Sequence, residues 1–231
     1  MMSPTKLAIL GAGGPGKDTL GIIDDINKRS ENKREFNCIG FLDNDKSKWG
    51  KSIHGVEVLG PVEKASDLDS DVQFVNTIGG PSYFWKIPDI ISEAGIADER
   101  FVSVIHPDAY IAESADLGRG VIVYSDSCIY ENAIIGNHVM VKDARISHDD
   151  KVSDYTRIEG GTCIAGESTI GEACYLGMNC TIRGATTVED QALVGMGAVV
   201  VDDVPAKTVV AGVPAREMRK STESDDKYSD I

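Results

Sequence analysis

The chain is poor in histidine, tryptophan and positive charge, and it has no long hydrophobic run. Its 231 residues include four histidines, two tryptophans, and 23 lysines and arginines against 37 aspartates and glutamates, for a formal net charge of −14. No basic stripe compensates this charge, so we expect neither a nucleic acid nor an anionic membrane surface as a partner. Small anionic ligands remain compatible with this composition.

The absence of long apolar runs also limits where the protein is expected to act. No run approaches the roughly 20 residues needed to cross a bilayer. The N-terminus leads into the strand-like residues 7–10 without the apolar core of a signal peptide. The five cysteines have no disulfide-framework spacing, which favours reduced thiols. We therefore expect no membrane span and a cytoplasmic location.

Branched aliphatic residues recur at every sixth position through the second half of the chain. The first run is Ile111, Leu117, Val123, Ile129, Ile135 and Val141, and the second is Ile146, Val152, Ile158, Ile164, Ile170, Leu176, Ile182, Val188, Val194 and Val200. Four positions after nearly every one stands a small residue: Ala115, Ser127, Ala133, Thr156, Thr162, Ser168, Cys174, Cys180, Thr186, Ala192 and Ala198.

This period excludes a helix and indicates a parallel β-helix. Residues six apart point in different directions around a helix of 3.6 residues per turn. In a hexapeptide-repeat β-helix, three short strands make one triangular coil, with the branched residue inside and the small residue at the corner. Cys174 and Cys180 then occupy small interior positions and serve packing.

The six-residue spacing slips once, between Val141 and Ile146, which are five residues apart. Arg145 and Asp150 then occupy expected small positions, in a segment that reads Ile146-Ser147-His148-Asp149-Asp150. A regular solenoid has no reason to break its own rule unless something other than packing is required there. We therefore expect the catalytic point at this segment.

Residues 6 to about 100 lack the six-residue period and show alternating strand and helix patterns. We expect strands at 7–10, 36–42 and 72–78, and helices at 17–28 and 85–94. Such alternation predicts a small parallel sheet with Rossmann-like winding. At the other end of the chain, we expect the solenoid to stop near Val204-Pro205 and a short basic helix to follow Arg216.

A glycine-rich turn, Gly11-Ala12-Gly13-Gly14-Pro15-Gly16-Lys17, joins the first expected strand to the first expected helix. In that context the backbone amides of a helix N-terminus bind phosphates. Three interpretations are open: a P-loop, a nucleotide or nucleotide-sugar site, and a tight turn without a ligand. A P-loop requires Ser or Thr where Asp18 stands. For a nucleotide site, Asp43 and Asn44 are placed at the end of the second strand to bond a base or ribose.

Several motifs together carry a family resemblance that covers nearly the whole chain. They are Gly11-Ala12-Gly13-Gly14, Gly40-Phe41-Leu42-Asp43-Asn44-Asp45, Ile53-His54-Gly55-Val56, Val58-Leu59-Gly60, His106-Pro107, the hexads with His148-Asp149, Gly195-Met196-Gly197-Ala198-Val199-Val200, and Gly212-Val213-Pro214-Ala215. In these motifs and their order the chain resembles the left-handed β-helix sugar acetyltransferases. That family contains sialic acid O-acetyltransferases and the N-acetyltransferases of UDP-linked 4-amino-4,6-dideoxy sugars.

The resemblance implies a division of the chain into three parts. Residues 1–102 are expected to form an α/β Rossmann-like domain that binds a nucleotide sugar. Residues 103–217 are expected to form an all-β left-handed parallel β-helix, the acetyltransferase domain. Residues 218–231 are polar and acidic, and we expect them to form a disordered tail.

The resemblance also assigns roles to individual positions. It implies His148 as the catalytic base and Asp149 as its partner carboxylate. It implies nucleotide-sugar contacts at Gly13, Gly14, Pro15, Asp43, Asn44 and Gly79. It implies that acetyl-CoA lies in the groove between neighbouring β-helices of a homotrimer, against coils that contain Arg157, Gly166, Gly177, Gly195 and Met196. Pro15 and Arg157 stand where the family often has histidine, and Asn44 replaces a common aspartate.

Acetyl transfer from a thioester needs a base that is neutral near pH 7, and the ordinary histidine pKa of about 6.5 suits that task. His148 lies two places after the inward Ile146, so its ring is expected to point outward, toward solvent or a neighbouring subunit. Asp149 or Asp150 can accept a hydrogen bond from one ring nitrogen and leave the other free. No nucleophilic serine or cysteine is needed if the acceptor attacks the thioester directly.

We therefore expect an acetyl-CoA-dependent N-acetyltransferase of a UDP-linked 4-amino-4,6-dideoxy sugar, acting as a homotrimer with active sites at subunit interfaces. Two alternatives are O-acetylation of sialic acid or another surface-glycan sugar, and a non-catalytic trimer that binds nucleotide sugars.

A zinc enzyme of the γ-carbonic anhydrase type needs several nitrogen or sulfur ligands. The solenoid offers only His106, His138 and His148, so we expect no metal. We expect His106 to be structural and His54 and His138 to be exposed.

Overall fold

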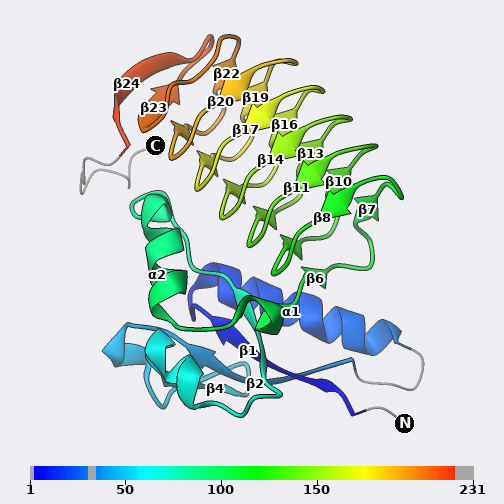
Figure 1. Cartoon of the computed structure of the whole chain (residues 1–231), viewed down its shortest axis with the longest axis vertical. Coiled ribbons are helices and arrows are strands. Elements are labelled where there is room, and N and C mark those ends of the chain that lie inside the picture. The colour runs from blue at the N-terminus through cyan, green and yellow to red at the C-terminus, as the bar shows by residue number, and fades with distance from the viewer. Residues whose placement is uncertain (1–2, 31–34, 222–231) are drawn as a thin grey trace.

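The computed structural model describes residues 3–30 and 35–221. An N-terminal α/β domain lies against one side of a left-handed parallel β-helix, and the chain enters the β-helix directly from that domain (Figure 1). Both parts of the predicted fold class are confirmed. Among the described residues, no helix combines the length and apolar character that a membrane crossing requires.

The N-terminal domain is built on a five-stranded sheet with the order β3-β4-β2-β1-β5. The strands are β1 Thr5–Leu10, β2 Phe36–Leu42, β3 Ser52–Ile53, β4 Val56–Gly60 and β5 Gln73–Asn76. All pairs are parallel except β3 with β4. The helices are α1 Gly14–Arg29 and α2 Ile87–Glu93, with short 3-10 helices at Lys46–Lys48, Val62–Asp67, Phe84–Lys86 and Asp98–Arg100. The parallel sheet expected from the strand and helix pattern is present.

Helix α1 begins at Gly14, three residues earlier than the sequence predicts. Gly13 is its N-cap, and Pro15 lies in its first turn, where the missing amide hydrogen costs nothing and the fixed φ favours a helix. The glycines therefore lead directly into the helix N-terminus. Alternate residues of β1 serve two cores, because Leu7 and Ile9 pack with α1 whereas Ala8 and Leu10 pack on the α2 side.

The β-helix has three sheets, and nearly every strand is two residues long. The sheet that faces the N-terminal domain, here called the covered sheet, contains β6 Val104–Ile105, β9 Ile122–Val123, β12 Met140–Val141, β15 Arg157–Ile158, β18 Tyr175–Leu176, β21 Leu193–Val194, β23 Thr208–Ala211 and β24 Arg216–Lys220. The first open sheet contains β7 Tyr110–Ile111, β10 Cys128–Ile129, β13 Arg145–Ile146, β16 Cys163–Ile164, β19 Thr181–Ile182 and β22 Val199–Val200. The second open sheet contains β8 Asp116–Leu117, β11 Ile134–Ile135, β14 Lys151–Val152, β17 Thr169–Ile170 and β20 Thr187–Val188.

The hexad residues fill the interior as predicted, and the slip lies between Val141 and Ile146 as expected, one corner before the corner that carries His148. Tyr110 pairs with Cys128 at a spacing of 18, whereas Cys128 pairs with Arg145 at a spacing of 17. The missing residue therefore shortens the corner 142–144, where buried Ala144 takes the small position. Arg145 points outward and is exposed, so its expected place at a small position was wrong. Asp150 does occupy a small position and is fully buried.

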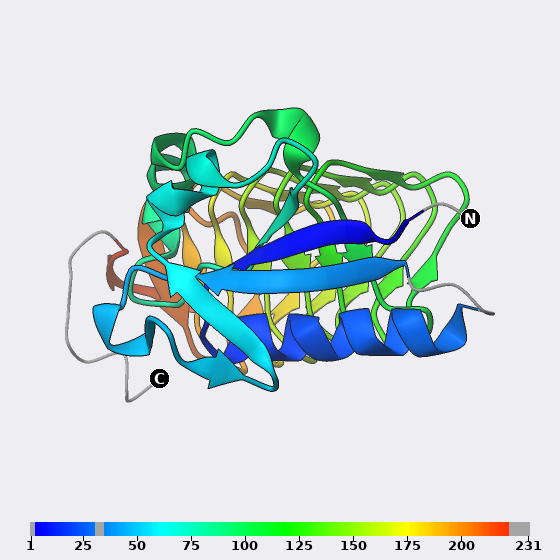
Figure 2. The same ribbon diagram turned by 90° about the horizontal axis from the view of Figure 1, so that it is seen from below.

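The outward residues of the covered sheet explain how the two domains are joined. They are Val104, Ile122, Met140, Arg157, Tyr175, Leu193 and Val209, and all but Tyr175, which is half-buried, are buried. They pack into the two apolar clusters of the N-terminal domain. Figure 2 shows α1 running along the stack of coils, and Figure 1 shows that it lies between the coils and the N-terminal sheet. The domains therefore share their cores.

Arg157 is the single charged residue in that buried column. Its guanidinium donates to the carbonyl of Ile78 from Nη2 at 2.6 Å and Nε at 3.2 Å, and to the carbonyl of His138 from Nη1. Only 1% of the residue is exposed, and this burial lowers its pKa to about 10. The expected contact between Arg157 and acetyl-CoA does not fit this position. We reassign Arg157 to the domain junction.

The end of the β-helix also differs from expectation. The segment expected to form a basic helix is strand β24, antiparallel to β23. Strand β24 continues to Lys220, so the boundary expected at 217 cuts through a strand, and residues 222–231 of the expected tail lie outside the described residues.

Replacing Arg157 is expected to weaken the junction. Arg157→Met leaves the buried carbonyls of Ile78 and His138 without their donors, so the free energy of unfolding should fall by about 3 kcal/mol. Thermal unfolding by calorimetry measures the change. The matched control Arg145→Met alters an exposed outward arginine and should stay within about 0.5 kcal/mol of wild type. Equal losses in both variants would contradict the assignment.

Candidate functional site

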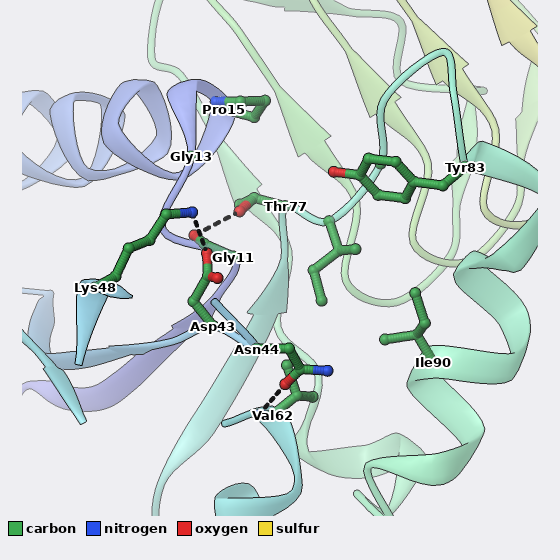
Figure 3. Close-up of a pocket in the computed structure, with 12 residues that line it drawn as sticks. Gly11, Gly13, Pro15, Asp43, Asn44, Lys48, Val62, Thr77, Tyr83 and Ile90 are labelled. Atoms are coloured by element: carbon green, nitrogen blue, oxygen red, sulfur yellow. Dashed lines mark hydrogen bonds and ion pairs between the residues drawn. The ribbon is translucent and has the colours of Figure 1, made fainter. Parts of the chain in front are cut away.

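A pocket of about 250 Å³ lies below the glycine-rich turn, at the carboxyl ends of β1, β2 and β5 (Figure 3). Its lining comprises Gly11, Gly13, Pro15, Asp43, Asn44, Lys48, Val62, Thr77, Ile78, Gly79, Tyr83 and Ile90. This edge of a parallel sheet, beside a helix N-terminus, is where such folds bind nucleotides. Five of the six residues expected at the nucleotide sugar line it, and Gly14 does not.

Asp43 organises the glycine-rich turn. Its Oδ2 accepts hydrogen bonds from the backbone amide of Ala12 at 2.7 Å and from Lys48 Nζ at 2.9 Å. Its Oδ1 accepts from the amide of Asp45 at 2.8 Å. Both carboxylate oxygens are therefore engaged within the protein, and Asp43 fixes the turn rather than presenting a free carboxylate.

Lys48 was missed by the sequence reasoning. It lies in the short helix Lys46–Lys48, outside every motif, and only its ion pair with Asp43 brings its ammonium group to the pocket. A cation beside the α1 N-terminus makes this end of the pocket attractive to an anion. A lysine in a polar loop gives no sequence signal of that role.

Asn44 and Gly79 fit the pocket for different reasons. Asn44 Oδ1 accepts from the amide of Val62 at 2.8 Å, which leaves the side-chain NH₂ as a donor. Gly79 has a φ of +144°, and a Cβ there would lie 2.6 Å from Arg157 Nε. Glycine is required at this position because the junction arginine passes directly behind the pocket wall.

His148 forms a pair with Asp149 at the corner between the first and second open sheets. Its Nδ1 lies 2.9 Å from Asp149 Oδ2, and Asn132 Nδ2 donates to the other carboxylate oxygen at 3.1 Å. The two side chains are 60% and 50% exposed. The hydrogen bond to Asp149 raises the pKa of His148 and lowers that of Asp149. Asp149 therefore orients the ring with Nε2 turned away from it.

The next coil provides the surface on which this ring lies. A Cβ at Gly166 would stand 2.7 Å from His148 Cε1 and 2.8 Å from His148 Nε2. The side chain of any other residue would therefore displace the imidazole. Gly166, expected at acetyl-CoA, is thus a neighbour of the histidine.

Gly177, Gly195 and Met196 meet at another corner, between the covered sheet and the first open sheet. With Pro81, Tyr175, Met178, Leu193 and Val194 they line a mainly apolar groove of about 70 Å³. Met178 and Met196 are about half exposed. Pro81 belongs to the same loop as Gly79 and Tyr83 of the pocket, so groove and pocket are neighbours.

One chain does not bring all these residues together. The pocket and the groove lie where the covered sheet meets the N-terminal domain, whereas the His148 corner joins the two sheets that the domain does not cover. In a triangular coil that corner is opposite the covered sheet. Within one chain, His148 therefore lies on the opposite side of the coil from the pocket.

The remaining histidines are structural or remote. His106 is buried as expected, and its Nδ1 accepts from the amide of Asp108 at 3.1 Å. His138 was expected to be exposed, but it is buried between the edge of Phe101 and the face of Tyr155, and burial lowers its pKa to about 4. His54 is exposed, as expected.

Comparison with known proteins gives matches to both parts of the chain. Residues 6–87 match the family of the PglD N-terminal domain. The galactoside O-acetyltransferase of Escherichia coli K12 is 35% identical over 150 residues, which cover 61% of this chain and 74% of that protein. The GDP-perosamine N-acetyltransferase of E. coli O157:H7 is 28% identical over 226 residues, 94% of this chain and 97% of that protein. The bifunctional protein GlmU of Wolbachia pipientis wMel is a longer relative, and the match covers only 39% of its length.

Among solved structures, the acetyltransferase domain of PglB from Neisseria gonorrhoeae FA1090, in complex with acetyl coenzyme A, superposes with a TM-score of 0.78. The two chains are 26% identical, and the match covers 94% of this chain and all of that one. The similarity therefore extends over the N-terminal domain and the β-helix together.

Proposed function

This chain belongs to the family of hexapeptide-repeat, left-handed β-helix sugar acetyltransferases, and we propose that it acetylates the amino group of a UDP-linked 4-amino-4,6-dideoxy sugar from acetyl-CoA. The observation that carries the proposal is the His148 pair. An exposed imidazole is held by Asp149 through Nδ1 and keeps Nε2 available as a proton acceptor.

The pocket below the glycine-rich turn supports a nucleotide-linked acceptor. The amides at the α1 N-terminus and the ammonium group of Lys48 suit a diphosphate. The free NH₂ of Asn44 suits a carbonyl oxygen on a base. Both uracil and guanine carry such an oxygen, so a GDP-linked amino sugar is a second candidate, favoured by the similarity to the GDP-perosamine N-acetyltransferase.

The groove at Gly177, Gly195 and Met196 supports acetyl-CoA as the donor. Its apolar lining and narrow shape fit the thin arm that carries the thioester. Acetyl-CoA supplies an acyl group whose thiolate leaves readily. No metal is needed for this chemistry, and among residues 3–30 and 35–221 no cluster of three or more His, Cys, Asp or Glu side chains is arranged to hold one.

In the proposed reaction the acceptor amine attacks the thioester carbonyl carbon directly. His148 Nε2 takes the proton that the amine loses as the C–N bond forms. Asp149 stabilises the resulting imidazolium and keeps the ring in one orientation. The same imidazolium then gives its proton to the departing sulfur as the C–S bond breaks, which restores the base.

We propose a homotrimer with three shared sites. Threefold packing of the β-helices closes the assembly and sets the His148 corner of one subunit beside the pocket and groove of the next. The separation of these features in one chain supports that arrangement. We also propose a cytoplasmic location and a role in surface-glycan biosynthesis.

O-acetylation of sialic acid or another sugar hydroxyl is the main alternative. The similarity to the galactoside O-acetyltransferase favours it but covers only 61% of this chain. The pocket lies in the N-terminal domain, which matches the PglD family. This pocket is the reason for preferring a nucleotide-linked acceptor.

The function is tested by release of free CoA from acetyl-CoA with a panel of acceptors: UDP- and GDP-linked 4-amino sugars, sialic acids and a simple galactoside. We expect turnover on a UDP-linked amino sugar, with kcat about 10²- to 10⁴-fold lower in His148→Ala. His54→Ala removes an exposed histidine far from the pocket and should keep full activity. Turnover on free sugars alone would favour O-acetylation. Binding of nucleotide sugars without any turnover would favour the non-catalytic trimer.

Asp149→Asn should change the pH profile in a defined direction. The base acts when neutral, so kcat rises as pH rises through the pKa of His148, which Asp149 holds above its usual value. Without the carboxylate that pKa falls, so the acidic limb of the profile should move to lower pH. The plateau rate should drop about 10- to 100-fold. Glu167→Gln removes a charge near the ring without breaking the hydrogen bond and should move the limb less. If the acidic limb of the Asp149→Asn pH profile did not move, the assigned pairing of His148 with Asp149 would be excluded.

Shared sites can be tested by complementation between two inactive variants. His148→Ala keeps the pocket, whereas Gly13→Phe obstructs it. Gly13 has a φ of −88°, and only Pro15 Cδ lies within 4 Å of an added Cβ, so the chain should still fold. Mixed trimers formed by co-expression should regain about one quarter of wild-type activity, from random pairing of neighbours. If each site lay within one chain, the mixture would remain inactive.

A further inference from the structure

Asp150 breaks the small-residue rule inside the β-helix. It lies at a corner in line with Ala133, Ser168 and Thr186 of neighbouring coils, and it is 0% exposed. Burial raises the pKa of its carboxyl group to about 7. Among the residues that the structure describes, no cation pairs with it, and the charged groups of its own turn are His148 and Asp149. Alanine, serine or threonine at the same place would avoid this desolvation cost, so packing does not explain the carboxylate.

The carboxylate instead holds two successive turns. Its Oδ2 accepts from the amide of Ser147 and its Oδ1 accepts from the amide of Ser168, both at 2.8 Å. At the corner in line with Asp150 on the preceding coil, the corresponding amide makes only a long bond within its own turn, 3.3 Å from Ala133 N to Tyr130 O. At another corner the single hydroxyl of Thr156 accepts one amide, that of Cys174 in the next coil. A hydroxyl group cannot separately accept both amides in this way, and an asparagine has only one acceptor oxygen.

The two turns joined by Asp150 are the ones that meet at His148. Ser147 begins the turn that carries the histidine, and Ser168 closes the turn that contains Gly166, on which the ring lies. A shift between these turns would change the direction of His148 Nε2. Resting on the function proposed above, we propose that Asp150 is a positioning residue that locks the His148 turn to the Gly166 turn and thereby aims the base.

Asp150→Asn and Asp150→Ser test this role. Asparagine keeps the size but has one acceptor oxygen for the two amides, of which that of Ser147 also donates to the carbonyl of Ile164 at 3.2 Å. Serine restores the residue type used elsewhere at this position. If Asp150 aims the base, kcat should fall about 10- to 100-fold, because small misplacements of a catalytic group have effects of that size. KM for both substrates should stay within about twofold, since Asp150 is fully buried and bonds only to Ser147 and Ser168, neither of which lines the pocket or the groove.

A second measurement does not depend on the acceptor. The ¹⁵N chemical shifts of the histidine rings report which nitrogen carries the proton, and among the four histidines the His148 signals are identified by their loss in His148→Ala. In wild type the proton of neutral His148 should reside on Nδ1, facing Asp149. In both Asp150 variants the His148 signals should move toward those of a freely exchanging imidazole.

Thr156→Ala is the matched control. Thr156 is also buried at a corner, and its Oγ1 accepts from the amide of Cys174 at 3.0 Å, but that corner does not carry His148. This variant should retain kcat and the His148 signals. Asp150 variants with unchanged His148 signals would overturn the proposal, whatever their rates. If wild type fails to acetylate any acceptor, the proposed function fails, and the ring signals still decide whether Asp150 orients His148.

Discussion

The β-helix depends on backbone hydrogen bonds that run mainly from coil to coil. Nearly every strand of the β-helix has two residues and pairs with the strands directly above and below it. No strand is long enough to hold its place alone, so the stack is stable only if every coil repeats the same path. The corners must then turn without disturbing the pairing. Chemistry can be added at a corner, because the strands on either side keep its position fixed.

The three sides of the coil differ in what their outer surfaces contact. One side is apolar on its outer surface and belongs to the N-terminal domain, while the other two sides carry exposed residues. The nucleotide pocket and the histidine consequently lie on opposite parts of the chain. A site that needs both can exist only in an assembly.

Much of the fold could be predicted because it follows from short periods. The six-residue repeat located the strands of the β-helix, and the alternating elements predicted the parallel sheet. The glycine-rich turn and Asn44 could be found because local motifs mark the ends of strands. The burial of Arg157 could not be predicted from the sequence. Arg157 has the same outward position in its hexad as Arg145, which is exposed. Only the packed domain distinguishes the two. Lys48 was missed and His138 was misjudged for the same reason: tertiary contacts bring both residues to their positions. The slip between Val141 and Ile146 could be located from the sequence, and it shortens the corner that precedes the His148 corner.

The length of helix α1 corresponds to the height of a stack of several coils. Its 16 residues extend about 24 Å, and parallel strands are spaced about 4.8 Å apart, so the helix spans about five coils. It runs along the stack and packs on residues from several of them (Figure 2). Most solenoids can gain or lose a repeat in evolution because each repeat touches only its neighbours. Here an inserted coil would extend past the N-terminal domain that covers this side and expose apolar residues to water. The length of the N-terminal domain therefore restricts the number of coils that this β-helix can have.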